Sequence, residues 1–396
     1  MSTGNPNIGR RSAWLLGSLA AVICASLLFG SVLAPAARVG GRNPVPLDGN
    51  PTAVAFSPDS KLVATSNAAS NTISIFKAAA SLDPIPGSPF HTAPDPLSVT
   101  FSPNGKLLAV ASGRAGEVIL YQVAGDGSLK RAPESPIEGL GGARQVAFTP
   151  NGKVLVVLGS GSLAFFSVDA DGRLHRLSGS GLDCGGYSFA ISPDGKLIAC
   201  AAEGRLNVLQ LSVDEQGVRL HPLPGMPLAT GAKQASSVAF DPDGKLIAVG
   251  NEDPQTVSMF VVLTDVTKPI EVKGSPFDNL GENQPDVATV PSAIAFSPNG
   301  RVLAATNLSF PIDAGNDWSS VNFFSVGDSL SDLGRLTPRE KYVPINGTLG
   351  PPVRGSTIAF SPDGRWFAAT TTDGAYAQGW LALFTNPQFS SRSHRH

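Results

Sequence analysis

The chain has 396 residues, of which 42% are hydrophobic and 15% are charged, with 43 glycines and 33 prolines. This composition is that of a folded protein, and the many glycines and prolines favour short strands joined by turns over a helical fold. The formal net charge is -2, which excludes the strongly basic character of nucleic-acid-binding domains. No nucleic-acid partner is therefore predicted.

An uncharged apolar segment follows two arginines near the N-terminus. Arg10 and Arg11 precede residues 13–33, and Ala34-Pro35-Ala36 has the small-residue pattern of a signal-peptide cleavage site. The apolar run is also long enough to span a bilayer, so residues 1–37 are predicted to be either a signal peptide or a membrane anchor helix. Both alternatives place the rest of the chain outside the cytoplasm, secreted or anchored, with membrane contact only through residues 13–33.

Seven copies of one unit occupy the rest of the chain. Each has an apolar run, a turn of the form Ser-Pro-Asp/Asn-Gly-Lys/Arg, and a second run that is apolar at nearly every position. Proline, Asp or Asn, and glycine each suit their place in such a turn, and Ser60 alone replaces the glycine. A continuous apolar run is typical of a strand covered on both faces. The units lie at 53–67, 98–112, 145–159, 188–202, 237–251, 293–307 and 357–371.

The spacing of these units predicts the architecture. The residue before each turn recurs at intervals of 45, 47, 43, 49, 56 and 64 residues, and four strands in about 45 residues is the period of a propeller blade. We predict an all-β, seven-bladed β-propeller over residues 38–389, followed by a disordered tail at 390–396. Residues 43–48 are predicted to supply the outer strand of the seventh blade, which would remove an open sheet edge.

The expected strand pairing indicates how close two cysteines of the predicted propeller lie to each other. Antiparallel pairing around the turn at Ser192–Gly195 places Cys200 near Ser188, several residues from Cys184. A disulfide requires Cα atoms within about 7 Å, so it would need the loop at Asp183–Tyr187 to fold back. A disulfide and two unpaired buried thiols both remain open.

The units resemble the YVTN and lactonase-like seven-bladed propellers of the wider WD-repeat-like superfamily. The resemblance rests on the turn motif followed by Leu-Ile-Ala, on Asp-Gly-Ser-Leu at 126–129, and on Gly-Ser-Pro-Phe at 87–90 and 274–277. It covers nearly the whole predicted propeller and implies a lactone-hydrolysing relative. Members often carry Gly-x-Arg-His before a blade, where this chain has Gly142-Ala143-Arg144-Gln145 and therefore lacks the histidine.

Polar side chains after the second strand of each blade are expected to gather on one face of the ring. Glu203 and Glu252 come from adjacent blades, and two carboxylates in a partly dry site would raise the pKa of one of them. Arg144 would polarise a carbonyl or hold a carboxylate, so these three are the catalytic candidates. The ligand-binding candidates are Asn67, Arg114, Arg205, Asn251 and Asn307.

The sequence supports two functional hypotheses. None of the histidines forms a ligand pattern with cysteine or another histidine, and no phosphate loop is present, so no metal and no cofactor are predicted. The favoured hypothesis is a scaffold in the cell envelope that binds a protein or a small ligand. The alternative is a hydrolase acting on a sugar-acid lactone, and oligomeric state is left open.

Overall fold

The computed structural model describes residues 44–79, 81–179, 182–184, 186–263, 267–279, 288–310, 320–329, 332–344, 353–373 and 378–385. All of them fall in one compact unit, Val39–His396. The predicted leader at 1–37 and the tail at 390–396 lie outside the described residues. Within the described ranges there is no helix long and apolar enough to cross a membrane.

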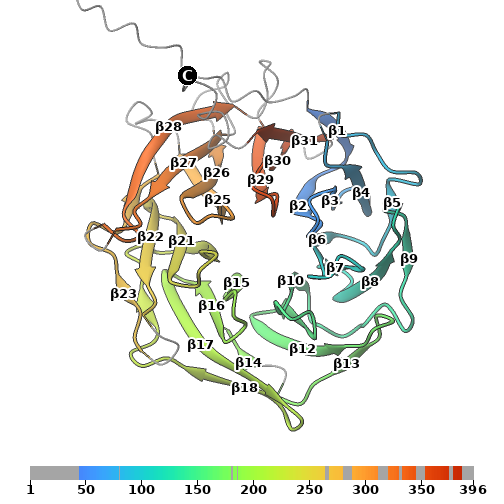
Figure 1. Ribbon diagram of the computed structural model, residues 1–396, viewed down its shortest axis with the longest axis horizontal. Helices are drawn as coiled ribbons and strands as arrows, with labels where there is room; N and C mark the ends of the chain where they lie inside the picture. Colours follow the sequence, from blue (N-terminus) through green and yellow to red (C-terminus); the bar gives the residue numbers. More distant parts are fainter. Residues whose placement is uncertain are drawn as a thin grey trace, which may run out of the picture. The chain divides into compact units, whose positions relative to one another are not determined.

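Seven antiparallel sheets form the blades of a ring (Figure 1). The prediction of an all-β, seven-bladed propeller is thus confirmed for the described residues. The innermost strands contact one another around the ring, and β29 meets β2. They are β2 (Pro51–Phe56), β6 (Pro96–Phe101), β10 (Ala143–Phe148), β15 (Ser188–Ile191), β20 (Ala235–Phe240), β25 (Ala288–Phe296) and β29 (Val353–Phe360).

The other strands follow outward in the same order in each blade. The second strands are β3 (Leu62–Asn67), β7 (Leu107–Ser112), β11 (Val154–Gly159), β16 (Leu197–Ala202), β21 (Leu246–Glu252), β26 (Val302–Phe310) and β30 (Trp366–Asp373). The third strands are β4 (Thr72–Lys77), β8 (Glu117–Val123), β12 (Ser162–Val168), β17 (Arg205–Asp214), β22 (Gln255–Val261), β27 (Ser320–Val326) and β31 (Gln378–Thr385).

The outer edge is a single strand in four blades and is split into two pieces in the third, fourth and fifth. The single outer strands are β5 (Phe90–His91), β9 (Leu129–Arg131), β28 (Leu336–Pro344) and β1 (Val45–Asp48). The split ones are β13 (Leu174–Arg176) with β14 (Leu182–Asp183), β18 (Gly217–Pro222) with β19 (Leu228–Ala229), and β23 (Ile270–Glu271) with β24 (Phe277–Asp278).

The ring is closed by the first strand of the described chain. β1 pairs antiparallel with β31, with Val45 opposite Leu381 and Asp48 opposite Gln378. The N-terminal segment is therefore the outer strand of the seventh blade, as predicted, because the last unit of the sequence supplies only three strands of its own.

The hydrophobic core lies between blades. Seven buried clusters are present, and each combines side chains of two neighbouring blades. The second strands β7, β11 and β16 are buried at every residue. Their continuous apolar sequences therefore reflect packing on both faces of the sheet, as predicted.

The five-residue turns between the first and second strands define one face of the ring, which we call the turn face. In the first blade the hydroxyl of Ser57 donates to Asp59 Oδ1 at 2.6 Å and accepts from the N–H of Leu62 at 2.9 Å. Ser60 takes φ 60°, the left-handed conformation that glycine adopts in the other turns. Its hydroxyl accepts a hydrogen bond from the N–H of Asp363 at 3.0 Å, so the first and last turns are linked.

Asp241 is an exception among the turn residues. The other six turns carry a Ser or Thr hydroxyl at this place, whereas Asp241 offers a carboxylate that accepts from the N–H of Leu246 at 2.7 Å. The residue is only 6% exposed, and burial raises the pKa of its carboxyl group above the usual value.

Asp241→Ser is expected to raise the free energy of unfolding by about 1 kcal/mol at neutral pH. Because the pKa of Asp241 is raised in the folded state, its ionised form is the destabilising one. The gain should be present at neutral pH, should shrink as the pH falls through the raised pKa of Asp241, and should be gone below the ordinary value of 3.8. Urea unfolding at neutral and acidic pH measures this, and equal stabilities at neutral pH would contradict it.

The Gly-Ser-Pro-Phe segments have a structural role. Ser88 Oγ accepts a hydrogen bond from the N–H of Ile75 at 2.9 Å, and Ser275 Oγ accepts one from Met259 at 3.0 Å. Ser135 makes the same contact with Leu120 at 2.9 Å. In each case the serine satisfies a third-strand N–H that lies outside the pairing with the outer strands.

Candidate functional site

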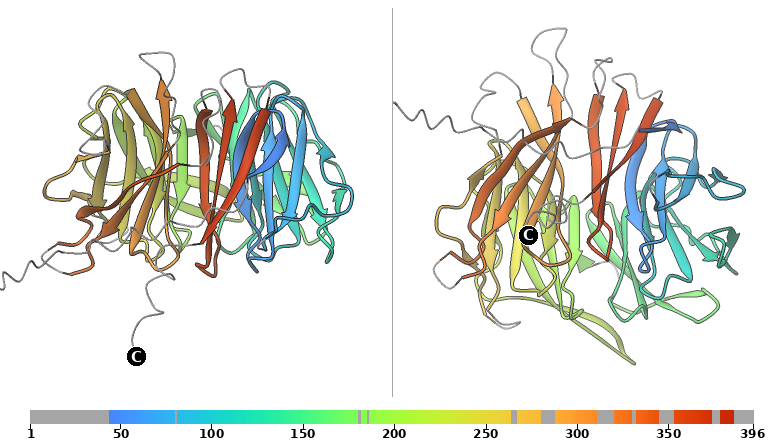
Figure 2. Two further views of the ribbon diagram at one scale, coloured as in Figure 1. Left: turned by 90° about the horizontal axis from the view of Figure 1, so that it is seen from above. Right: turned by 45° about the horizontal axis from the view of Figure 1, so that its top comes forward.

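The loops after the second strands lie on the face opposite the turns, which we call the loop face. Figure 2 shows the strands running between these two faces. In six blades the innermost strand carries a bulge in its half nearer the loop face, where the pairing skips one residue. Bulges redirect a side chain and are frequent beside functional sites. The skipped residues are Thr52, Leu97, Arg144, Ser236, Ser292 and Ser356.

Arg144 and Tyr187 meet where the third and fourth blades adjoin. Tyr187 directly precedes β15, and its N–H donates to the carbonyl of Ala201 at 3.0 Å. The guanidinium carbon of Arg144 lies 6.0 Å from the centre of the Tyr187 ring, within the range of a cation–π interaction. Tyr187 is 49% exposed and Arg144 is exposed. No carboxylate pairs with Arg144 among the described residues, so its donors face solvent.

A disulfide holds the segment that carries Tyr187. Cys184 and Cys200 are bonded, with their Cα atoms 5.8 Å apart, and their side chains are 2% and 1% exposed. The segment folds back because β14 pairs with β12 of the preceding blade. Cys200 lies opposite Phe189, one residue from the position near Ser188 that the sequence suggested. Of the two open alternatives, the structure therefore shows the disulfide.

Gln145 joins the same two blades. Its amide nitrogen donates to the carbonyl of Phe189 at 2.8 Å, and its amide oxygen accepts from the N–H of Phe189 at 2.9 Å. One side chain thus completes both hydrogen bonds of a backbone position on the neighbouring innermost strand. Gln145 therefore holds the blades together directly beside Arg144.

The two glutamates differ in environment. Glu252 ends β21, is half-buried, and has a pKa raised by desolvation. In the described part of the chain no cation or donor pairs with its carboxylate. Glu203 is exposed and lies in a tight turn with φ 44°.

The glutamates are not joined to each other or to Arg144. Gly204, next to Glu203, lies against Ala232, and the N–H of Glu252 donates to the carbonyl of Gln234 at 2.9 Å. Residues 232–234 therefore adjoin both glutamate loops. Within the described ranges no hydrogen bond or ion pair connects any two of the three catalytic candidates.

The predicted ligand-binding residues fall into two groups. Asn67 and Asn251 are completely buried, and the Nδ2 of each donates to hydroxyls of its own blade at 2.8–3.1 Å: Thr72 and Ser74, or Thr256 and Ser258. These hydrogen bonds hold the loop between the second and third strands. Because both amides are buried and bonded within their own blade, we do not retain them as ligand-binding residues. Arg114 and Arg205 are exposed on the loop face. Asn307 is part of β26, but its side chain lies outside the described part of the structure.

A metal site does not emerge from the described side chains. No group of three or more His, Cys, Asp or Glu residues among them is placed to hold an ion. Two features of the described loop face stand out chemically: the guanidinium of Arg144 beside the ring of Tyr187, and the half-buried carboxyl group of Glu252.

The sequence of this chain matches the model of one known protein family. The family model described as lactonase, 7-bladed β-propeller, matches residues 45–276. The chain belongs to this family. The matched residues include the first four blades, most of the fifth, and all three catalytic candidates. No curated protein matches the chain in sequence.

Solved structures confirm the propeller fold of this lactonase-family chain. The β-propeller domain of Cps50 (Swd1) from Myceliophteria thermophila is similar, with 13% identity, a TM-score of 0.61, and coverage of 87% of this chain and 98% of that one. A Lactobacillus plantarum protein has 16% identity, a TM-score of 0.60, and coverage of 75% and 86%. Kuenenia stuttgartiensis hydrazine synthase has 16% identity, a TM-score of 0.59, and coverage of 86% and 96%. At these identities the similarity concerns the fold alone.

Sequence reasoning missed two residues of this lactonase-family site. Tyr187 was not selected, although it is an aromatic residue directly before a repeat unit, where the other units carry small, aliphatic or basic residues. Gln145 was noted only as the replacement of a histidine, whereas the structure shows it bonded to the adjacent blade.

Proposed function

We propose that this chain is an exported lactonase-family propeller that binds a carboxylate-bearing small ligand, such as a sugar acid, on its loop face. The observation that carries the proposal is the exposed pair of Arg144 and Tyr187 on neighbouring blades. A guanidinium binds a carboxylate through two parallel hydrogen bonds. An exposed aromatic ring offers a flat apolar surface for the body of the ligand.

The rigid setting of this pair supports the proposal. Gln145 bonds the two blades beside Arg144, and the disulfide of Cys184 and Cys200 restrains the segment before Tyr187. A site whose side chains are held in place loses less entropy when the ligand binds.

Two features support export to the cell envelope or beyond. The leader has the pattern of a signal peptide or anchor. A buried disulfide is typical of proteins that mature in an oxidising compartment, and Cys184 and Cys200 form one. Whether the mature protein is secreted or anchored depends on cleavage of the leader, which mass spectrometry of the exported protein would determine.

Arg144→Ala is expected to weaken the binding of gluconate or glucuronate about tenfold or more, because it removes a charge-assisted hydrogen-bonding group. Isothermal titration calorimetry measures the affinity. Arg114→Ala, which removes another exposed arginine of the loop face, is the matched control and should leave the affinity nearly unchanged. Equal losses in the two variants, or none in either, would contradict the assignment to Arg144.

Hydrolysis of a sugar-acid lactone is the second candidate function. Family membership and the raised pKa of Glu252 favour it. As a general base, the ionised carboxylate would take a proton from water, and the resulting hydroxide would attack the lactone carbonyl. The ring C–O bond would then break, and the departing ring oxygen would take the proton held by Glu252, which gives the hydroxy acid and restores the carboxylate.

If Glu252 is this base, turnover should rise with pH through a pKa above the ordinary value of 4.5, because only the ionised form accepts the proton. Glu252→Gln should lower turnover at least a hundredfold, and Glu203→Gln is the control. A panel of lactones followed by proton release measures both. Turnover that survives Glu252→Gln would exclude this role. If the wild type hydrolyses none of the lactones, ligand binding remains as the proposed function.

A further inference from the structure

The turn face carries a groove at the junction of the first two blades, on the opposite side of the ring from Arg144 and Tyr187. It has a volume of about 1110 Å³, slightly above the roughly 300–1,000 Å³ that is usual for small-ligand sites. Its floor includes Leu62 and Val123. Four cationic side chains line it, whereas the acidic side chains of the lining are Asp59 and Asp126. The cations are Lys61, Lys77, Lys106 and Arg365.

The cations differ in whether their charge is already paired. Lys61 Nζ lies 3.2 Å from Asp59 Oδ2, and Arg365 Nε lies 2.6 Å from Asp363 Oδ2. No acidic partner faces the ammonium groups of Lys77 and Lys106 in the part of the chain that the structure describes.

Lys106 has no counter-charge because its turn carries Asn104 where the first turn carries Asp59. Asn104 Oδ1 accepts from the Ser102 hydroxyl at 2.7 Å and from the Lys106 N–H at 3.0 Å. Asp59 Oδ1 makes the same two bonds, at 2.6 and 3.1 Å, and uses its second oxygen for Lys61. Asn104 has an amide nitrogen in place of that oxygen. The turn is therefore built identically, but its lysine has no counter-charge.

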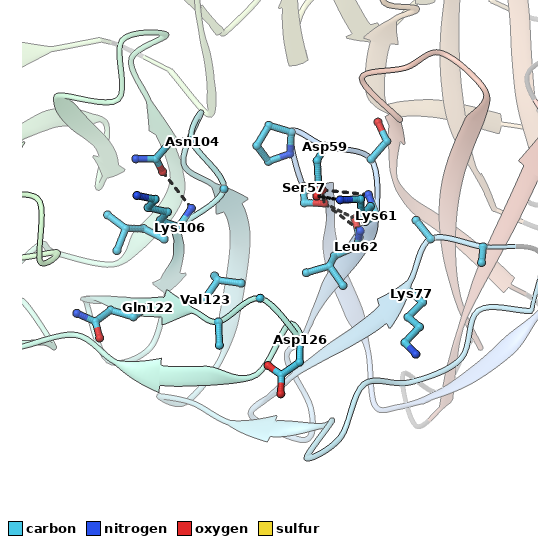
Figure 3. A pocket seen from close by; sticks show the side chains of 18 of the residues that line it. Ser57, Asp59, Lys61, Leu62, Lys77, Asn104, Lys106, Gln122, Val123 and Asp126 are labelled. Carbon is cyan, nitrogen blue, oxygen red and sulfur yellow. Dashed lines mark hydrogen bonds and ion pairs between the residues drawn. The ribbon is translucent and has the colours of Figure 1, made fainter.

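Figure 3 shows Lys106 and Lys77 on opposite sides of the groove in this view, with Leu62 and Val123 between them. The remaining acid, Asp126, accepts bonds from the N–H and hydroxyl of Ser128 at 2.9 and 2.7 Å. Two unpaired cations on either side of an apolar floor suit a ligand with two anionic groups on a partly apolar body.

We propose that this groove is a second binding site, which takes a small ligand bearing two phosphate or carboxylate groups through Lys106 and Lys77. It is independent of the loop face, because no residue of the groove belongs to that face.

The test swaps Asp and Asn at equivalent positions of two turns that have the same hydrogen bonds. Asn104→Asp keeps both turn hydrogen bonds and adds the oxygen that would pair with Lys106, so the affinity for fructose 1,6-bisphosphate should fall about three- to fivefold. Asp59→Asn removes the partner of Lys61 and should strengthen binding by a similar factor. Both residue types occur naturally in this turn, so neither variant should disturb folding. Calorimetric titrations with the full-length protein measure the change.

A matched control separates the groove from general surface charge. Lys153 also follows an asparagine in its turn, but it lies outside the groove. Lys106→Ala should weaken bisphosphate binding about tenfold, whereas Lys153→Ala should not. Inorganic phosphate should bind more weakly than the bisphosphate, because it reaches only one cation. Equal effects of the two alanine variants, an unchanged affinity in Asn104→Asp, or binding of polyglutamate but of neither phosphate probe would overturn the proposal.

Discussion

Replacing both Cys184 and Cys200 by alanine is expected to lower the free energy of unfolding by about 3 kcal/mol. The bond closes a loop with a sequence separation of 16 residues, and a loop of this length restricts the unfolded chain by about that amount. Both sulfur atoms lie in the cluster between the third and fourth blades, so the substitutions also remove some buried contacts. Guanidinium unfolding of the variant and the wild type measures the difference.

The reduced wild type is the control for this prediction, because it loses the covalent bond without losing atoms. Its unfolding midpoint should move most of the way toward that of the alanine variant, and reductant should not affect the variant. If oxidised and reduced wild type unfold at the same denaturant concentration, the bond contributes nothing to stability.

Leu47→Ala is expected to lower the free energy of unfolding by about 3 kcal/mol, although it changes a strand of only four residues. Leu47 is 4% exposed and packs in the cluster between the seventh and first blades, with Leu381 and Val54 among its neighbours. The loss combines a cavity with weakened closure of the ring, since β1 covers the edge of β31.

Asp48→Ala is the matched control for Leu47, because Asp48 belongs to the same strand and is exposed. Its free energy of unfolding should stay within about 0.5 kcal/mol of the wild-type value. Equal midpoints for Leu47→Ala and the wild type would show that the first strand does not close the ring in solution.

The repeat units determined the number of blades, the turns and the strands covered on both faces. These features depend on local patterns: a turn needs residues with suitable φ angles, and a buried strand needs a continuous apolar run. The closing strand at Val45–Asp48 could also be predicted, because the last unit lacked a fourth strand.

The candidate site was predictable only in part. Arg144 was selected from its motif, but its contact with Tyr187 depends on a bulge in one strand and on a segment that folds back from the preceding blade. Asn67 and Asn251 looked like exposed loop residues, yet both amides turn inward to bond hydroxyls of the next strand. A sequence pattern does not report which way a polar side chain turns at the end of a strand.

The propeller, its blade count and the closure of its ring can all be derived from the order of the residues, because each follows from periodic hydrophobic burial and short-range turn chemistry. Three other features are visible only in the folded protein: Cys184 bonds to Cys200, Gln145 joins two blades, and Lys106 faces a groove without a counter-charge. Those features arise where separate segments meet, and the geometry of such meetings is set by the packing of whole blades rather than by the residues adjacent in the chain.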